Sequence, residues 1–171
     1  MNNQLITVQE FASFRDIGKK LDEAKINECI KQAQSTDLFD VLNDFFFDLV
    51  ENKDSIQYQD LLSGSTFSVN NQSFSQAGIK SLLADYTYNR YMYSINTNFT
   101  PFGATQKYGQ DSQPVDRNLL KDIAKQTQVD ADIKFKMIDK YLKSNSSIFT
   151  RYQTGNNPDI NTGSVRYSII K

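Results

Sequence analysis

The most informative feature of this 171-residue sequence is what it lacks, since it contains no histidine, no tryptophan and a single cysteine, Cys29. Without histidine, the commonest general base at neutral pH is missing, and Ser–His or Cys–His nucleophile pairs cannot form. A zinc site of the usual Cys/His kind cannot be built from one chain, and one cysteine cannot form an internal disulfide. We therefore expect no catalytic residue, no metal site, no bound cofactor and no enzymatic activity, with Cys29 as a small buried residue of a helix.

Glycine is also scarce, and neither sign of charge is in clear excess. The seven glycines form neither a Gly-x-Gly-x-x-Gly motif nor a phosphate-binding loop that ends in Gly-Lys-Ser/Thr. With 19 basic and 20 acidic residues the net charge is −1, which argues against bulk binding of nucleic acid but leaves a local basic patch open. No stretch approaches the ~20 apolar residues of a membrane span, and the first residues lack the basic flank and apolar core of a signal peptide. We expect a protein without a membrane partner that stays in the cytoplasm where it is made.

What the sequence does contain is helical periodicity, within a hydrophobic content of 39% that is ordinary for one globular domain. Thr7 and Glu10 form the pattern of a capping box, and Asp22 can cap the next helix. Apolar residues spaced three and four apart predict helices over residues 8–17, 22–35, 36–50, 77–95 and 116–143, the third of them capped by Ser35 or Thr36. The predicted fold class is mainly α, a small bundle of about five helices.

One inserted β-hairpin is predicted near residues 65–75. Two short runs of serine, threonine and phenylalanine flank Asn70 and Asn71, and asparagine tolerates the positive φ that a two-residue hairpin turn needs. In that register Phe67 lies opposite Phe74. An isolated hairpin is only marginally stable, so this one should lie on the helices or on a partner.

The chain divides into a helical domain over residues 1–145 and an extended C-terminal arm over residues 146–171. In the arm, Val165, Tyr167 and Ile169 occupy alternate positions, which is the pattern of a short strand. A strand of this kind presents an unpaired edge, so we expect it to pair with a neighbouring subunit or another protein. A disordered terminus is the alternative.

A line of four aspartates is the most chemical-looking feature of the sequence. Asp37, Asp40, Asp44 and Asp48 fall on roughly the opposite face of the third predicted helix from its apolar residues. Carboxylates can bind metals, but helical di-metal sites also use histidine, which this chain lacks. We predict a solvated or subunit-facing surface, with metal binding, catalysis or a docking face for a basic partner as alternatives.

Aromatic residues mark two further candidate interfaces. Tyr88 and Tyr91 lie in the second half of the fourth predicted helix, which is apolar almost all round, so we expect them to serve core and subunit-interface roles. A base-stacking platform is the alternative. Residues 96–115 are predicted to form a long irregular loop, in which Phe99 and Phe102 anchor contacts with a neighbouring subunit.

Short motifs also follow one another in a familiar order. The most specific are residues 100–103 (Thr-Pro-Phe-Gly) and residues 58–64 (Tyr-Gln-Asp-Leu-Leu-Ser-Gly). Residues 58–64 lead into the hairpin. Further matches are residues 5–11, 21–23, 33–34 and 78–80, with Lys107, Ser112 and Pro114. On these residues, spread over positions 5–145, the sequence resembles head–tail connector-like proteins of tailed phages that infect Bacteroidetes, including the crAss-like group.

The resemblance implies a helical adaptor that packs on a portal protein as a ring of roughly twelve copies. Its partners would be copies of itself, the portal protein and other neck or tail proteins, and packaged DNA would pass through the lumen without specific contacts. It implies a location in the neck of the virion and brings no catalytic residues with it. Three alternatives stay open, namely a small non-catalytic interaction module acting as a monomer or dimer, an enzyme with a carboxylate-only site, and a nucleic-acid-binding protein.

Overall fold

The computed structural model describes residues 3–15, 17, 22–95, 97–100, 103–106 and 116–152, with the backbone alone described for the two segments between 97 and 106. This part of the chain is mainly helical and carries antiparallel hairpins, so the predicted fold class is confirmed. The helices are α1 (Val8–Phe14), α2 (Glu23–Gln32), the π-helical segment η1 (Ala33–Leu38), α3 (Phe39–Leu42), α4 (Phe45–Glu51), α5 (Ile56–Ser63), α6 (Ile79–Ser94) and α7 (Arg117–Ser144). The strands are β1 (Ser65–Val69), β2 (Gln72–Gln76), β3 (Thr97–Thr100) and β4 (Gly103–Gln106).

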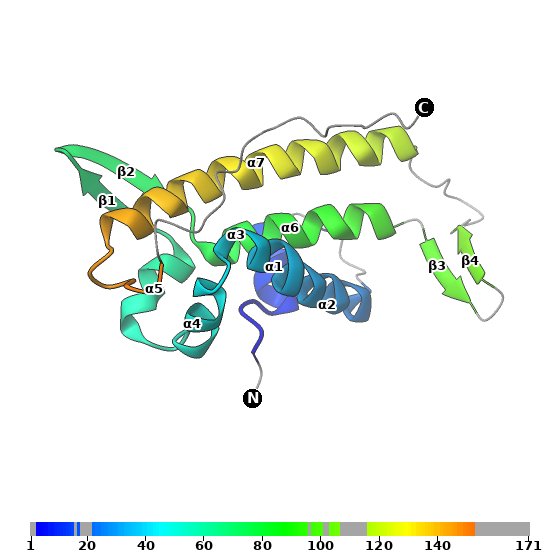
Figure 1. Ribbon diagram of the computed structural model, residues 1–171. Helices are drawn as coiled ribbons and strands as arrows, with labels where there is room; N and C mark the ends of the chain where they lie inside the picture. Colours follow the sequence, from blue (N-terminus) through cyan, green and yellow to red (C-terminus); the bar gives the residue numbers. More distant parts are fainter. Residues whose placement is uncertain are drawn as a thin grey trace, which may run out of the picture.

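Helix α6 runs through the middle of the fold. It packs against α1, α2, η1, α5 and α7, and α7 lies alongside it over most of its length (Figure 1). Its first half buries Ile79, Leu82, Leu83 and Tyr86. Helix α6 is therefore the element against which the other helices are positioned.

The first two helices begin at the predicted caps. The Thr7 hydroxyl accepts a hydrogen bond from the Glu10 backbone N–H at 3.1 Å, and the Glu10 carboxylate accepts one from the Thr7 N–H at 2.8 Å, which completes a capping box. Asp22 accepts from the backbone of the first turn of α2 at 3.1 Å. Helix α1 ends at Phe14, earlier than predicted, because Arg15 is already extended, with φ −135° and ψ 132°.

The predicted cap at Ser35 or Thr36 is wrong. Helix α2 continues through η1 into α3, and the Thr36 hydroxyl donates back to the Gln32 carbonyl oxygen at 2.5 Å instead of capping a new helix. The wider π turn keeps Leu38 in the core. The chain breaks later, at Asn43, whose φ of 48° and ψ of −134° redirect it into α4.

The β1–β2 hairpin has the predicted register. Phe67 lies opposite Phe74, and Asn70 and Asn71 have φ of 50° and 62° in the turn. The hairpin packs against α7, where the Phe67 ring meets the Tyr141 ring edge-on with 5.3 Å between centroids. The hairpin therefore lies on the protein's own helices, which is one of its two predicted locations.

Helix α5 precedes this hairpin and is not predicted from the sequence, because its eight residues offer only a short apolar stripe. Gly64 follows the last residue of α5, and Gly78 follows the hairpin, with φ of 96° and 86°. The two backbones approach so closely that a Cβ on Gly78 would lie 2.5 Å from the Leu62 carbonyl oxygen. This close approach admits only glycine, and it fixes where the hairpin leaves the bundle.

The prediction of an irregular loop over residues 96–115 is wrong for its first half. Strands β3 and β4 pair antiparallel, with Phe99 opposite Ala104 and Thr100 opposite Gly103. The second hairpin extends beyond the C-terminal end of α6 (Figure 1). Its strands have four residues each, too few for a clear alternation of apolar and polar residues.

The core continues past the end of α7. Phe149 and Tyr152 are buried, and both rings meet Phe45 of α4 edge-on, at centroid distances of 6.0 and 5.3 Å. Both residues belong to the predicted extended C-terminal arm over residues 146–171. Within the described residues they instead join the larger of two buried hydrophobic clusters, which also includes Leu5.

Candidate interaction surface

The four aspartates do not share one face as predicted. The chain turns between α3 and α4, which leaves Asp40 and Asp44 exposed and sends Asp37 and Asp48 to other elements. Asp37 accepts two hydrogen bonds from the guanidinium of Arg90 on α6, at 2.6 and 2.7 Å. This bidentate ion pair ties η1 to α6.

Asp48 is buried, so its assignment to an exposed interface is wrong. The Tyr58 hydroxyl donates to Asp48 Oδ2 at 2.5 Å, and the Asn52 side chain donates to Oδ1 at 3.2 Å. The Arg151 guanidinium lies 3.5 Å from the same carboxylate. Burial, together with the hydrogen bond to Asp48, raises the pKa of Tyr58. Asp48 therefore holds α4 against α5 and against the segment that follows α7.

Beside Asp40 and Asp44, three phenylalanines form an exposed cluster. The rings of Phe39, Phe46 and Phe47 meet edge-on in pairs, with centroid distances between 5.6 and 5.8 Å. Phe39 is 37% exposed and Phe47 is 61% exposed. The chain turn at the end of α3 produces this arrangement, because it folds the first turn of α4 back onto Phe39.

The phenylalanine cluster has an acidic border. Asp40, Asp44, Glu51 and Asp54 are exposed on or next to α3 and α4. We call Phe39, Phe46, Phe47, Asp40, Asp44, Glu51 and Asp54 the acidic aromatic surface. It retains two of the aspartates singled out in the sequence, while its aromatic part was missed.

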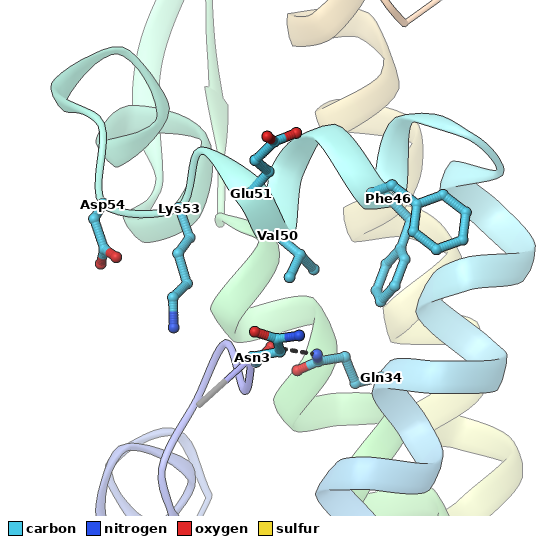
Figure 2. A pocket seen from close by; sticks show the side chains of 8 residues that line it. Asn3, Gln34, Phe46, Val50, Glu51, Lys53 and Asp54 are labelled. Carbon is cyan, nitrogen blue, oxygen red and sulfur yellow. Dashed lines mark hydrogen bonds between the residues drawn. The ribbon is translucent and has the colours of Figure 1, made fainter. Parts of the chain in front are cut away.

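A hollow of about 830 Å³ adjoins this surface. Phe46 and Val50 point from α4 toward Asn3 and Gln34 on the facing wall, and Lys53 and Asp54 lie beyond the end of the helix (Figure 2). The lining is mostly apolar on the α4 side and polar on the other. An apolar concavity with a polar margin is suited to receive a side chain or helix of a partner rather than a reacting group.

The Gln34 side chain builds the facing wall of the hollow. Its amide donates to the Asn3 carbonyl oxygen at 2.8 Å and accepts from the Leu5 backbone N–H at 2.9 Å. A glutamine that is bonded in this way pairs with the N-terminal segment as a neighbouring strand would. Sequence reasoning missed this role, because nothing in the local pattern marks Gln34 as buried.

The predicted tyrosines on α6 are packed within the molecule. Tyr88 and Tyr91 are partly buried against the hydrophobic core, and Arg15 lies over the Tyr88 ring at 5.1 Å from its centroid. Burial raises the pKa of Tyr91. Of the neighbouring tyrosines, Tyr93 is widely exposed. Rings held in this way contribute to the core.

A buried ionic tie was not foreseen from the sequence. Asp85 on α6 is 1% exposed and lies 2.5 Å from Arg15 Nη2 and 2.7 Å from Lys134 Nζ. Lys134 also donates to the Ser81 hydroxyl at 2.9 Å. The tie joins the end of α1, the middle of α6 and the middle of α7, so it holds the bundle together.

Several other predicted interface residues cannot be placed. Phe102, Val165, Tyr167 and Ile169 lie outside the described residues, and Phe99 is described by its backbone alone. Among the residues that the structure describes, no group of three or more cysteine, aspartate and glutamate side chains could hold a metal ion.

Two further features of the described chain are its cysteine and the apolar character of its helices. Cys29 is buried on α2 as predicted, and burial raises the pKa of its thiol. None of the described helices combines the length and the apolar character needed to cross a membrane.

Comparison with known proteins places the chain in a family. A family model described as a family of unknown function, DUF6712, matches residues 38–162, well over half of the chain. The chain belongs to this family. The DUF6712 match includes the acidic aromatic surface, both hairpins, α6 and α7, whereas α1 and α2 precede it. Searches of curated proteins and of solved structures find no match.

Proposed function

We propose that the protein is a structural subunit of a tailed-phage neck, a connector ring protein that docks on the portal and joins the capsid to the tail. The observation that carries the proposal is the acidic aromatic surface with its adjoining hollow. The resemblance to head–tail connector-like proteins supports the same assignment. The role is geometric, because such a subunit acts by holding its neighbours in a closed arrangement.

The exposed phenylalanines lack the stabilising free energy that burial of their side chains in an interface would contribute. Full burial of a phenylalanine side chain contributes about 1.5–3 kcal/mol, and Phe47 keeps 61% of its surface in water. Clustered exposed apolar residues with a polar border mark interaction sites. An interface that covers Phe39 and Phe47 would gain both this apolar burial and the favourable contacts of their rings.

The interior of the protein is built to hold such a surface in place. The Asp85 tie and the Asp37–Arg90 pair connect helices that are distant in the chain, and the Asp48–Tyr58 hydrogen bond connects the consecutive helices α4 and α5. These ties set the angle of α3 and α4 relative to the long pair of α6 and α7. A subunit that transmits load between head and tail needs a framework of this kind.

The proposed partners are copies of the chain, the portal protein and other neck or tail proteins. The resemblance implies a closed ring of roughly twelve copies, and a head-to-tail contact of this kind closes when its rotation divides a full turn. Packaged DNA passes through the lumen without specific contacts. A small interaction module that acts as a monomer or dimer would use the same surface without ring closure.

Molar mass separates these possibilities. Light scattering on the purified protein, alone and mixed with the portal and neighbouring neck proteins, is expected to reveal a large species that negative-stain images resolve as a ring. Phe47→Ser should abolish it, while Tyr93→Ser, which removes an exposed aromatic side chain from α6, should not. A protein that stays monomeric or dimeric in every mixture would contradict the connector assignment and favour the interaction module.

A further inference from the structure

The outer face of α7 is a second surface that the described residues leave uncovered. Leu119, Val129 and Ile133 are 52%, 45% and 56% exposed on this 28-residue helix. Ala131, by contrast, is buried and belongs to the stripe that faces the bundle. Each residue advances a helix by about 100°, so Ile133 lies roughly 200° around the helix from Ala131 and points away from the bundle.

The two surfaces carry opposite charge. Residues 37–54 contain six carboxylates and one lysine, a net charge of −5. Helix α7 contains seven basic and four acidic residues, a net charge of +3. Several of these groups are used inside the molecule, but Asp40 and Asp44 stay exposed beside the phenylalanines. On α7, Lys121, Lys125 and Lys136 stay exposed and outnumber the exposed Asp122 and Asp132.

The two surfaces also differ in shape and position. The acidic aromatic surface adjoins a hollow, whereas the outer face of α7 is a convex helical ridge. Helices α4 and α7 lie on opposite sides of α6 (Figure 1). A head-to-tail contact requires two different surfaces on opposite sides of one subunit, because each copy then offers one surface to each of two neighbours.

We propose that the acidic aromatic surface of one copy packs against the outer face of α7 of the next copy. This inference rests on the proposed ring function and names the contact that closes it. Phe39 and Phe47 cover the apolar ridge, and Asp40 and Asp44 face its lysines. A contact between two acidic aromatic surfaces, as a two-fold dimer would need, brings carboxylates against carboxylates and is repelled.

Paired charge reversals test the contact. The first variant, Asp40→Lys/Asp44→Lys, makes the acidic surface basic, and the second, Lys125→Glu/Lys136→Glu, makes the ridge acidic. Each variant alone juxtaposes like charges at every contact, so self-association should fall at least about tenfold. In an equimolar mixture each contact again joins opposite charges, so large species should return with the two variants in alternation.

Two controls keep the result specific. Glu23→Lys/Glu28→Lys changes the charge by the same amount on exposed positions of α2 and should leave assembly unchanged. Ile133→Ser removes apolar surface without a charge change and should weaken assembly, whereas Tyr93→Ser should not. Circular dichroism of each variant verifies that it is folded, and recovery in the mixture shows the same independently.

The outcomes separate this inference from the proposed function. The measurement is light scattering, alone and with the portal protein, as for the wild type. Rings that form from either reversed variant alone, or a mixture that fails to recover while the wild type assembles, would overturn the α7 contact and leave the connector assignment intact. A wild-type protein that never self-associates would overturn both. Recovery that occurs only in the mixture establishes the contact.

Discussion

The Asp85 tie allows a quantitative prediction about stability. Asp85 is buried on α6 between two cations, Arg15 and Lys134, whose side chains are 25% and 29% exposed. Replacement by asparagine keeps the volume and removes the charge. Breaking a buried ion pair from one side costs about 3–5 kcal/mol. Because both cations can turn toward water, we expect the lower end, about 3 kcal/mol for Asp85→Asn.

The cations should behave differently from the anion. Lys134→Met leaves Asp85 paired with Arg15, so we expect a loss of only about 1–2 kcal/mol. Arg15→Met should cost a similar amount for the same reason. The double variant leaves a buried carboxylate without a counter-charge and should cost more than the sum of the two single variants.

Urea unfolding followed by far-ultraviolet circular dichroism is a suitable assay, because the chain has no tryptophan to report by fluorescence. In a chain of this length, a loss of 3 kcal/mol lowers Tm by about 6–12 °C. The control is Asp37→Asn, which breaks the half-exposed pair with Arg90 and should cost less than about 1 kcal/mol. If Asp85→Asn unfolds within about 1 kcal/mol of the wild type, the assignment of Asp85 as the tie of the bundle is refuted.

Three further substitutions probe single interactions. Gly78→Ala should destabilise by about 3 kcal/mol or more, measured by thermal unfolding, because a Cβ would meet backbone at 2.5 Å in a residue with positive φ. Tyr58→Phe should cost about 1.5–3 kcal/mol in urea unfolding, because it removes the hydroxyl that donates to buried Asp48; an unchanged midpoint would contradict that role. Burial alone would raise the pKa of Glu10, but hydrogen bonds from Lys80 and from the backbone of the helix cap lower it below 4.5. Its contribution is therefore present above that pH and lost as pH falls through the lowered pKa, so Glu10→Gln should destabilise at pH 7 and have a progressively smaller effect as the pH falls through that pKa.

The local elements with a strong chemical signature could be predicted from the sequence. The capping box at Thr7 and the Asp22 cap depend only on residues within one turn, and both form. The Asn70-Asn71 turn requires positive φ that asparagine tolerates, and it sets the register of the first hairpin. Long helices with a steady apolar period were also recognisable, because many residues contribute to the same signal.

The candidate surface could be predicted only in part. The spacing of the aspartates assumes one straight helix, and the turn at Asn43 breaks it in two. Asparagine tolerates the positive φ at Asn43, but the apolar period continues across this residue, so the pattern predicts one helix. As a result Asp48 moves into the interior, and the exposed Phe47 comes to lie against Phe39.

The sequence by itself determined the helical class, the caps of the first two helices, the first hairpin and its turn, and the absence of histidine-based chemistry. Each depends on neighbouring residues or on composition. The tertiary structure alone decided that Asp85 is paired from two sides, that Phe149 and Tyr152 complete the core, and that Phe39 and Phe47 stay in water. These outcomes depend on which elements meet, because an aspartate or a phenylalanine has the same local propensity whether its helix presents it to the core or to solvent.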